Sequence, residues 1–188
     1  MDRLRVFIAI DVEDPLLLSR LERVKEALVA TGVPMKPVET QNIHLTLRFI
    51  GEVERHRVEE IIEGVLSNIK RPGFQIVLKG LGAFPSTARP RVVWVGVSEG
   101  SEELASLHDE IEAGLRRLGF QPQRERFVPH ITLARIKGSR NLPALIRIIE
   151  EYADYEFGAM RVSSVRLKKS TLTRRGPIYE TLWEVKLG

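Results

Sequence analysis

The spacing of hydrophobic and polar residues predicts a chain that alternates between strands and helices. Short apolar runs rich in β-branched residues indicate strands, and apolar residues three and four positions apart indicate helices. The strands are predicted at residues 5–11, 42–50, 74–84, 91–97, 127–136, 159–167 and 178–187. The helices are predicted at residues 14–31, 54–70, 102–118 and 141–153. Proline and glycine indicate a loop at 85–90 and a turn at 174–177.

The order of these elements repeats once, with an offset of 86 residues. Arg5-Val6 recurs as Arg91-Val92, and "HLTL" at 44–47 recurs as "HITL" at 130–133. One helix between them keeps the same register. Such self-similarity predicts an internal duplication. We therefore expect residues 1–188 to form a single bilobal domain, with repeat 1 at about 5–90, repeat 2 at about 91–187 and a pseudo-twofold axis between the lobes.

The two recurring tetrapeptides contain two of the four histidines. Residues i and i+2 of a strand point to the same face. His44 therefore shares a face with Thr46, and His130 shares a face with Thr132, while the alternate residues are apolar. A pseudo-twofold axis would direct both polar faces into one cleft. Arg48, four residues after His44, is expected on the same face.

Two opposed imidazoles are suited to general acid–base catalysis near neutral pH. One neutral ring removes a proton from water while one protonated ring supplies a proton to the leaving oxygen, and each contributes roughly 10²- to 10⁴-fold in rate. The two threonine hydroxyls can donate hydrogen bonds to the non-bridging phosphate oxygens. This set fits metal-free hydrolysis of a strained phosphodiester. The residues alone do not decide which histidine is the acid.

Other kinds of site fit the sequence less well. A single histidine on a strand is usually a hydrogen-bonded structural residue, but the matched register of two favours catalysis. Zinc needs three or four protein ligands; cysteine is absent, and His56 and His108 lie on predicted helices, where we interpret them as surface residues. No phosphate-binding loop, dinucleotide fingerprint or nucleophile elbow is found. We therefore expect no metal and no cofactor.

The amino-acid composition indicates the cellular compartment and the type of binding partner. The 188 residues are 43% hydrophobic and 29% charged, as in globular proteins. Without a long apolar run, a signal peptide or a cysteine, the sequence predicts a cytoplasmic protein. The net charge is +4, with 21 Arg and 8 Lys. Arginine is the better bidentate phosphate ligand, so a nucleic-acid partner is plausible. Arg126, Lys168 and Arg174 are expected to bind a phosphate-bearing substrate along a basic track, although a solvated basic surface would have the same composition.

The paired motifs resemble the H-x-T-x pair of the two-histidine (2H) phosphoesterase superfamily. The stretches "RVFIAID", "NIHLTLRFIGEV", "FVPHITLARI" and "VRLKKSTLTRRGPIYETL" are similar to one branch, the RNA 2′,3′-cyclic phosphodiesterases, also called 2′-5′ RNA ligases. The resemblance implies a bilobal α+β fold, with two antiparallel sheets lining a central cleft and helices outside.

The same resemblance implies an activity and a set of roles. The protein would hydrolyse a 2′,3′-cyclic phosphate to a 2′-phosphate. The substrate would be an RNA end, for example that of a tRNA fragment, or a nucleotide. His44 would donate a proton to O3′, His130 would accept a proton from water, and Thr46 and Thr132 would hold the phosphate. The resemblance also implies ligation through 2′-5′ bonds as related chemistry. We expect no obligate protein partner. The alternative is a non-catalytic protein that binds RNA ends or nucleotides.

Overall fold

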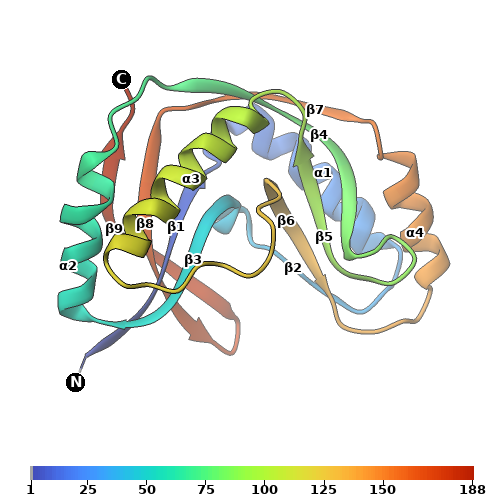
Figure 1. The fold of residues 1–188 in the computed structure, drawn as a ribbon. Coiled ribbons are helices and arrows are strands. Elements are labelled where there is room, and N and C mark those ends of the chain that lie inside the picture. Colours follow the sequence, from blue (N-terminus) through green and yellow to red (C-terminus); the bar gives the residue numbers. More distant parts are fainter. Residues whose placement is uncertain (1) are drawn as a thin grey trace.

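The structure is a computed structural model that describes residues 2–188 as an α+β chain (Figure 1). The strands are β1 (Arg3–Asp11), β2 (Met35–Pro37), β3 (His44–Glu54), β4 (Phe74–Pro85), β5 (Pro90–Val97), β6 (His130–Ile136), β7 (Glu156–Val162), β8 (Ser164–Thr173) and β9 (Gly176–Lys186). The helices are α1 (Pro15–Ala30), α2 (Arg55–Gly64), α3 (Ser101–Arg117) and α4 (Leu142–Glu151), with short 3₁₀ turns η1 (Thr40–Asn42) and η2 (Leu66–Asn68). Within residues 2–188, no helix is both long and apolar enough to cross a membrane.

The strands form two antiparallel halves that meet at one point. The order is β7-β4-β5-β6-β3-β1-β8-β9, and β2 pairs with β6. Strands β3 and β6 are joined only through the pair Leu45–Ile131. We call β3-β1-β8-β9 the first lobe and β7-β4-β5-β6 with β2 the second lobe. The helices lie outside the curled sheet (Figure 1). The predicted α+β class with two antiparallel sheets is confirmed, and the single pair makes the two sheets continuous.

The joining pair also shows how the lobes are related. Leu45 and Ile131 are 86 residues apart, so the antiparallel pairing joins equivalent residues and places a local twofold axis between them. The lobes nevertheless do not coincide with residues 5–90 and 91–187. Strand β4 belongs to the second lobe, and β8 and β9 belong to the first. Helix α1 packs against β2, β6 and β7, whereas α3 packs against β3. The repeat boundaries stay a prediction.

Local sequence explains most of the element boundaries. Helix α1 begins where the carboxylate of Asp14 accepts a hydrogen bond of 3.0 Å from the backbone N–H of Leu17, and Pro15 occupies its first turn. Its apolar stripe is buried in the core. Strand β3 runs past its predicted end because Gly51 adopts a φ of 98° and bends the strand without ending it.

Three predicted elements differ from the structure. The strand predicted at 159–167 is two strands, β7 and β8, that turn at residue 163. The helix predicted at 54–70 ends at Gly64 and is followed by η2. Strand β6 starts at His130 and not at residue 127, since Pro129 has no N–H to contribute to a ladder. The three-residue strand β2 is too short to leave a periodic pattern.

Candidate active site

A cavity of about 650 Å³ lies between the lobes and is lined by both motif strands. The structure brings His44, Thr46, His130 and Thr132 together in its wall. Other lining residues come from β1, from the segment around β2 and η1, and from the β8–β9 hairpin. Apart from the histidines, the whole lining contains four cations and one anion: Arg5, Lys36, Arg135, Arg175 and Glu39. The cavity is therefore a cationic site that suits a phosphate-bearing ligand.

The Leu45–Ile131 pair fixes how the four motif side chains are arranged. Leu45 and Ile131 are fully buried, so the residues on either side of each point to the other face of the sheet, into the cavity. Antiparallel register puts His44 beside Thr132 and His130 beside Thr46, with the two histidines on a diagonal. Diagonal neighbours in a regular ladder are about 7–8 Å apart. A phosphate with one hydrogen bond on each side fits such a span.

The ring of His44 is held at both nitrogens. Its Nδ1 lies 2.6 Å from the carbonyl oxygen of Asn42, and its Nε2 lies 3.0 Å from the hydroxyl of Thr46. Because a carbonyl can only accept, Nδ1 carries the proton of the neutral ring and Nε2 is left for chemistry. Phe7 and Tyr179 pack against the ring, with centroids at 5.1 and 5.3 Å.

The ring of His130 is held in the same way at Nδ1. Its Nδ1 donates to the carbonyl oxygen of Val128 at 2.7 Å, which again leaves Nε2 for chemistry. Phe84 lies edge-on at a centroid distance of 4.9 Å, and Trp94 lies at 6.2 Å. Gly82 makes this packing possible, because a Cβ there would meet the Trp94 ring at 2.3 Å. In both motifs, backbone carbonyls two residues before the histidine select the tautomer.

The expectation that Arg48 faces the cleft is wrong. Ile8 of β1 pairs with Arg48, and the next residue, Ala9, pairs with Thr46. Leu47 is therefore left without a partner on β1 and forms a bulge. A bulge reverses the alternation of faces. Arg48 is consequently buried on the helix side, where it binds the Glu112 carboxylate and donates to the carbonyls of Phe49 at 2.6 Å and Gln121 at 2.5 Å. It ties β3 to α3 and to the loop that precedes β6.

The second motif repeats the bulge and brings two unpredicted residues into the cavity. Pairing with β5 moves from Val93–Ala134 to Trp94–Thr132, so Leu133 is the extra residue. As a result Phe49 and Arg135, which occupy equivalent positions, both line the cavity. The guanidinium of Arg5 lies 4.6 Å from the centre of the Phe49 ring. Alternation alone could not reveal them, because a bulge depends on the partner strand.

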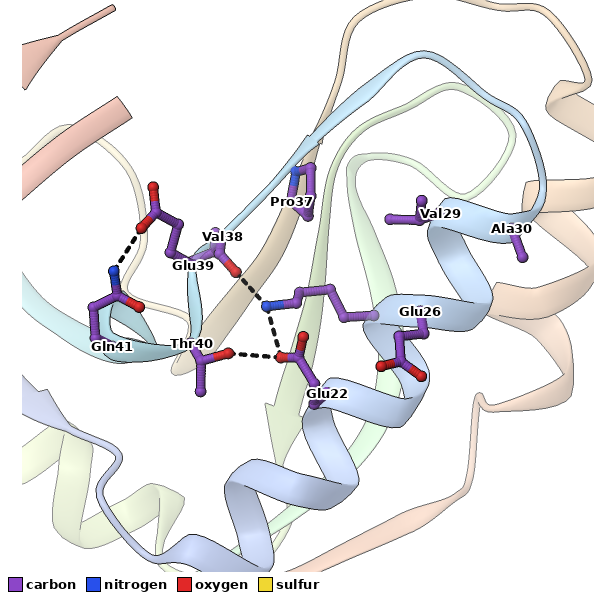
Figure 2. A pocket seen from close by; sticks show the side chains of 10 residues that line it. Glu22, Glu26, Val29, Ala30, Pro37, Val38, Glu39, Thr40 and Gln41 are labelled. Carbon is purple, nitrogen blue, oxygen red and sulfur yellow. Dashed lines mark hydrogen bonds and ion pairs between the residues drawn. The ribbon is translucent and has the colours of Figure 1, made fainter. Parts of the chain in front are cut away.

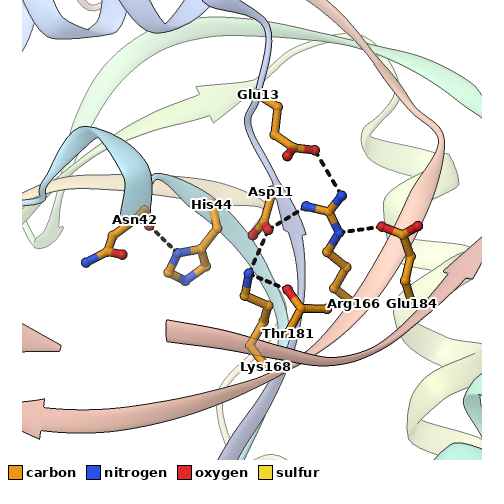
Figure 3. A network of polar contacts seen from close by, with 8 residues as sticks. All are labelled: Asp11, Glu13, Asn42, His44, Arg166, Lys168, Thr181 and Glu184. Carbon is orange, nitrogen blue, oxygen red and sulfur yellow. Dashed lines mark hydrogen bonds and ion pairs between the residues drawn. The ribbon is translucent and has the colours of Figure 1, made fainter. Parts of the chain in front are cut away.

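Lys168 was also expected to bind substrate, and the structure contradicts this. Its side chain is about 10% exposed, and its Nζ donates to Asp11 at 2.7 Å and to Thr181 at 3.0 Å. Asp11 also pairs with Arg166, which in turn contacts Glu13 and Glu184 (Figure 3). Lys168 thus belongs to an ion-pair network beside His44 and not to the lining of the cavity.

The remaining basic residues lie outside the cavity lining. Arg126 and Arg174 are exposed and are not among the residues that line the cavity, and their binding of substrate stays a prediction. The neighbouring Arg175 lines the cavity, and its carbonyl accepts a hydrogen bond of 2.9 Å from Lys36. His108, interpreted as a surface residue, is instead buried and stacked on Phe127 at 4.2 Å. It anchors the chain just before the second motif.

Burial sets the proton affinities of both histidines. Loss of solvent lowers the pKa of His44 below its ordinary value of 6.5, outweighing the Asn42 carbonyl and the Asp11 carboxylate, which raise this pKa. Loss of solvent likewise lowers the pKa of His130, against the Val128 carbonyl, and the charge of Arg135 lowers it further. The two rings therefore differ in the charges that act on them: a carboxylate and an ammonium, Asp11 and Lys168, at His44, and a guanidinium at His130.

No other grouping in residues 2–188 suggests a competing centre. Within that range, no three histidine or carboxylate side chains are placed to hold a metal ion. A second cavity lies along α1, where Lys25 donates to the carbonyl of Val38 and pairs with Glu22 (Figure 2). It shares the wall formed by residues 37–39 with the first cavity but contains neither motif.

The comparison of the sequence with protein families agrees with this site. The model of the 2′-5′ RNA ligase superfamily matches residues 19–171, and the chain belongs to this superfamily of two-histidine phosphoesterases. The family expected from the paired motifs is therefore confirmed.

Individual relatives narrow the similarity to one branch. The chain is 55% identical over 170 residues to an RNA 2′,3′-cyclic phosphodiesterase of Aeropyrum pernix, covering 90% of this chain and 96% of that protein. It is 40% identical over 179 residues to the protein of the same name from Archaeoglobus fulgidus, covering 95% and 98%. A crystal structure of TT0787 from Thermus thermophilus superposes with a TM-score of 0.80 at 25% identity, covering 97% of each chain. The crystal structure of Escherichia coli LigT complexed with 3′-AMP superposes with a TM-score of 0.75 at 25% identity, covering 99% of each chain.

Proposed function

We propose that this protein hydrolyses the 2′,3′-cyclic phosphate at an RNA end to a 2′-phosphate. The observation that carries the proposal is the pair of imidazoles in one cationic cavity, each with Nδ1 bound to a carbonyl and Nε2 left for proton transfer. The names of the similar proteins support this choice of substrate, and the nucleotide in the Escherichia coli LigT complex supports a nucleotide-sized site.

Charge supports one assignment of acid and base. The Asp11 carboxylate favours a protonated His44 more strongly than the Lys168 ammonium opposes it, and the Arg135 guanidinium favours a neutral His130. His130 Nε2 then accepts a proton from water as the water oxygen attacks phosphorus. The bond from phosphorus to O3′ breaks, and His44 Nε2–H gives its proton to O3′. One imidazole used in this way lowers the barrier by about 3–5 kcal/mol.

Other lining residues would hold the substrate during this step. Thr46, Thr132 and the inward-turned Arg135 present donors to the non-bridging oxygens, where negative charge grows. Phe49 is 39% exposed in the cavity and is backed by Arg5, so it offers a face on which a base can stack. Charge and stacking together select a nucleoside phosphate over inorganic phosphate. No step in this scheme calls on a metal ion.

The proposal is tested with an RNA oligonucleotide that ends in a 2′,3′-cyclic phosphate, in buffer containing EDTA. We expect conversion to the 2′-phosphate, and loss of turnover with His44→Ala and with His130→Ala. Arg55→Ala, at an exposed ion pair remote from the cavity lining, serves as the control. Binding without turnover would favour the non-catalytic alternative. A 3′-phosphate product would mean that O2′ leaves instead of O3′, which would contradict the assignment of O3′ as the leaving oxygen.

Ligation through a 2′-5′ bond is the same transfer with a ribose hydroxyl in place of water. It stays a prediction for this chain. Incubating RNA halves with the protein and measuring joined product against hydrolysed ends gives the ratio of the two reactions.

A further inference from the structure

The ion-pair network beside His44 is not used in the proposed reaction, and among residues 2–188 no such network lies beside His130. Asp11 is the direct cross-strand partner of His44 in the β1–β3 ladder, and such partners lie on the same face of a sheet. The corresponding cross-strand partner of His130 on β5 is Gly96. Only one of the two imidazoles therefore has a carboxylate across the strand.

The network places two opposite charges against one ring. Figure 3 shows the Asp11 carboxylate and the Lys168 ammonium on the same side of His44, joined at 2.7 Å. The side chains are 16% and 10% exposed, so water screens them only partly. Lys168 is fixed further by Thr181, and Asp11 by Arg166 at 2.7 Å. Neither charge can move away from the ring without breaking these bonds.

We propose that Asp11 and Lys168 are positioning residues that balance the proton affinity of His44: the carboxylate favours the imidazolium, and the ammonium opposes it. The proposal rests on the proposed function, in which His44 is the acid. An acid must be protonated before the reaction and must give up its proton during it. The carboxylate increases the fraction of His44 that carries the proton, and the ammonium makes that proton easier to release.

The other groups that face His44 do not provide this balance. Tyr179 on β9 is neutral at assay pH, because burial raises its pKa. His130 on β6 lowers the pKa of His44 only when it is itself protonated. The hydrogen bonds from Lys168 and Arg166 outweigh burial and keep the pKa of Asp11 below its ordinary value, so Asp11 is ionised. The fixed charges at the ring are therefore those of Asp11 and Lys168, with Arg166 behind Asp11.

Two substitutions of opposite sign test the proposal. Asp11→Asn removes the carboxylate and leaves Lys168 without its ion-pair partner, while Arg166 keeps Glu13 and Glu184, so the pKa of His44 should fall. Lys168→Met keeps the length of the side chain and leaves Asp11 paired with Arg166, so the pKa should rise. Glu184→Gln is the matched control: it removes a carboxylate bound to Arg166 at 2.6 Å, on the far side of the network from His44. NMR titration of the His44 ring measures the pKa directly.

The reaction rate gives a second, independent readout. On the alkaline side of the pH profile the rate is proportional to the fraction of His44 that is still protonated, and on the acid side it depends on His130 instead. Asp11→Asn should lower the alkaline rate, and Lys168→Met should raise it, each by about three- to tenfold, as expected for a nearby charge. The acid-side rate and the Glu184→Gln profile should not change.

The outcomes separate the two proposals. If both variants move the pKa of His44 in the same direction, or if neither moves it, the balance of charges is refuted. If the pKa values move apart as expected while the alkaline rates do not follow, the network is right and the acid role of His44 is wrong. Lys168→Met keeps the test decisive if Asp11→Asn fails to fold, since only a lost positive charge predicts a gain.

Discussion

Substituting Arg48 by alanine should unfold the protein more readily and should not weaken substrate binding. The Arg48 side chain is 9% exposed, and its guanidinium has three acceptors: the Glu112 carboxylate and the carbonyls of Phe49 and Gln121. Its removal leaves Glu112, 13% exposed, with a buried and uncompensated charge. Breaking such a pair from one side costs about 3–5 kcal/mol. For a domain of this size each kcal/mol is worth about 2–4 °C, so we expect a melting temperature lower by about 6–20 °C.

Urea unfolding and steady-state kinetics together measure this prediction. The double variant Arg48→Ala/Glu112→Ala should be less destabilised than the sum of the two single variants, because it leaves no unpaired charge. Arg55→Ala removes an exposed pair with Asp2 and should change stability by less than about 1 kcal/mol. At temperatures where Arg48→Ala stays folded, the KM for a cyclic nucleotide should equal that of the unmodified protein. Full stability with a raised KM would show that Arg48 binds substrate after all.

Three further predictions follow from the cavity. Since burial lowers the pKa of both histidines below 6.5, kcat/KM should trace a bell in pH whose maximum lies below 6.5 and which EDTA does not alter; a maximum well above neutral pH would contradict the burial argument. Thr46→Val or Thr132→Val should lower kcat by about 10²–10³ with unchanged melting, and His44→Ala or His130→Ala by at least as much. Arg126→Glu combined with Arg174→Glu should weaken binding of a longer RNA, most at low salt, and spare hydrolysis of a mononucleotide; equal losses on both substrates would place these arginines in the catalytic site.

Folding stability should also respond to the same two rings. A histidine whose pKa is lower in the folded state than in the unfolded state binds fewer protons when folded. The stability contributed by burying the neutral ring is therefore present above about pH 6.5, the ordinary histidine value, and is lost as the pH falls below it. Denaturant midpoints at pH 7.5 and pH 5 measure the loss, and the double variant His44→Ala/His130→Ala should show less of it. A midpoint unchanged between these pH values would contradict the lowered pKa values.

The sequence predicted those features that depend on short-range periodicity and on the 86-residue offset. The alternation in "HLTL" and "HITL" located the four motif residues in one cavity, because three residues of regular strand, from histidine to threonine, suffice to define a face. It failed at the fourth residue of each motif, where Leu47 and Leu133 bulge. Arg48 then turns outward, and Phe49 and Arg135 turn inward. A bulge is a property of two paired strands, and one sequence does not contain the pairing.

The positions of charged side chains were harder to predict from the sequence than those of apolar side chains. Basic residues near the second motif and in the tail look alike in sequence, yet Lys168 is buried in an ion pair while Arg174 is exposed at a turn. What separates them is the partner, Asp11, more than 150 residues away in the chain. The exchange of α1 and α3 between lobes is hidden for the same reason, since nothing local in a helix specifies the sheet that it covers.

The single residue pair that joins the sheets of the two lobes can act as a pivot between them. Leu45 and Ile131 are adjacent in sequence to His44 and His130, so the two reacting rings lie close to the pivot. A rotation of one lobe against the other displaces each atom in proportion to its distance from the pivot. Residues far from the pivot would be displaced most, once the hydrogen bond between Lys36 of the second lobe and the Arg175 carbonyl of the first is broken, whereas the separation of the imidazoles would hardly change. Entry of substrates of different size is thereby uncoupled from the spacing that proton transfer requires.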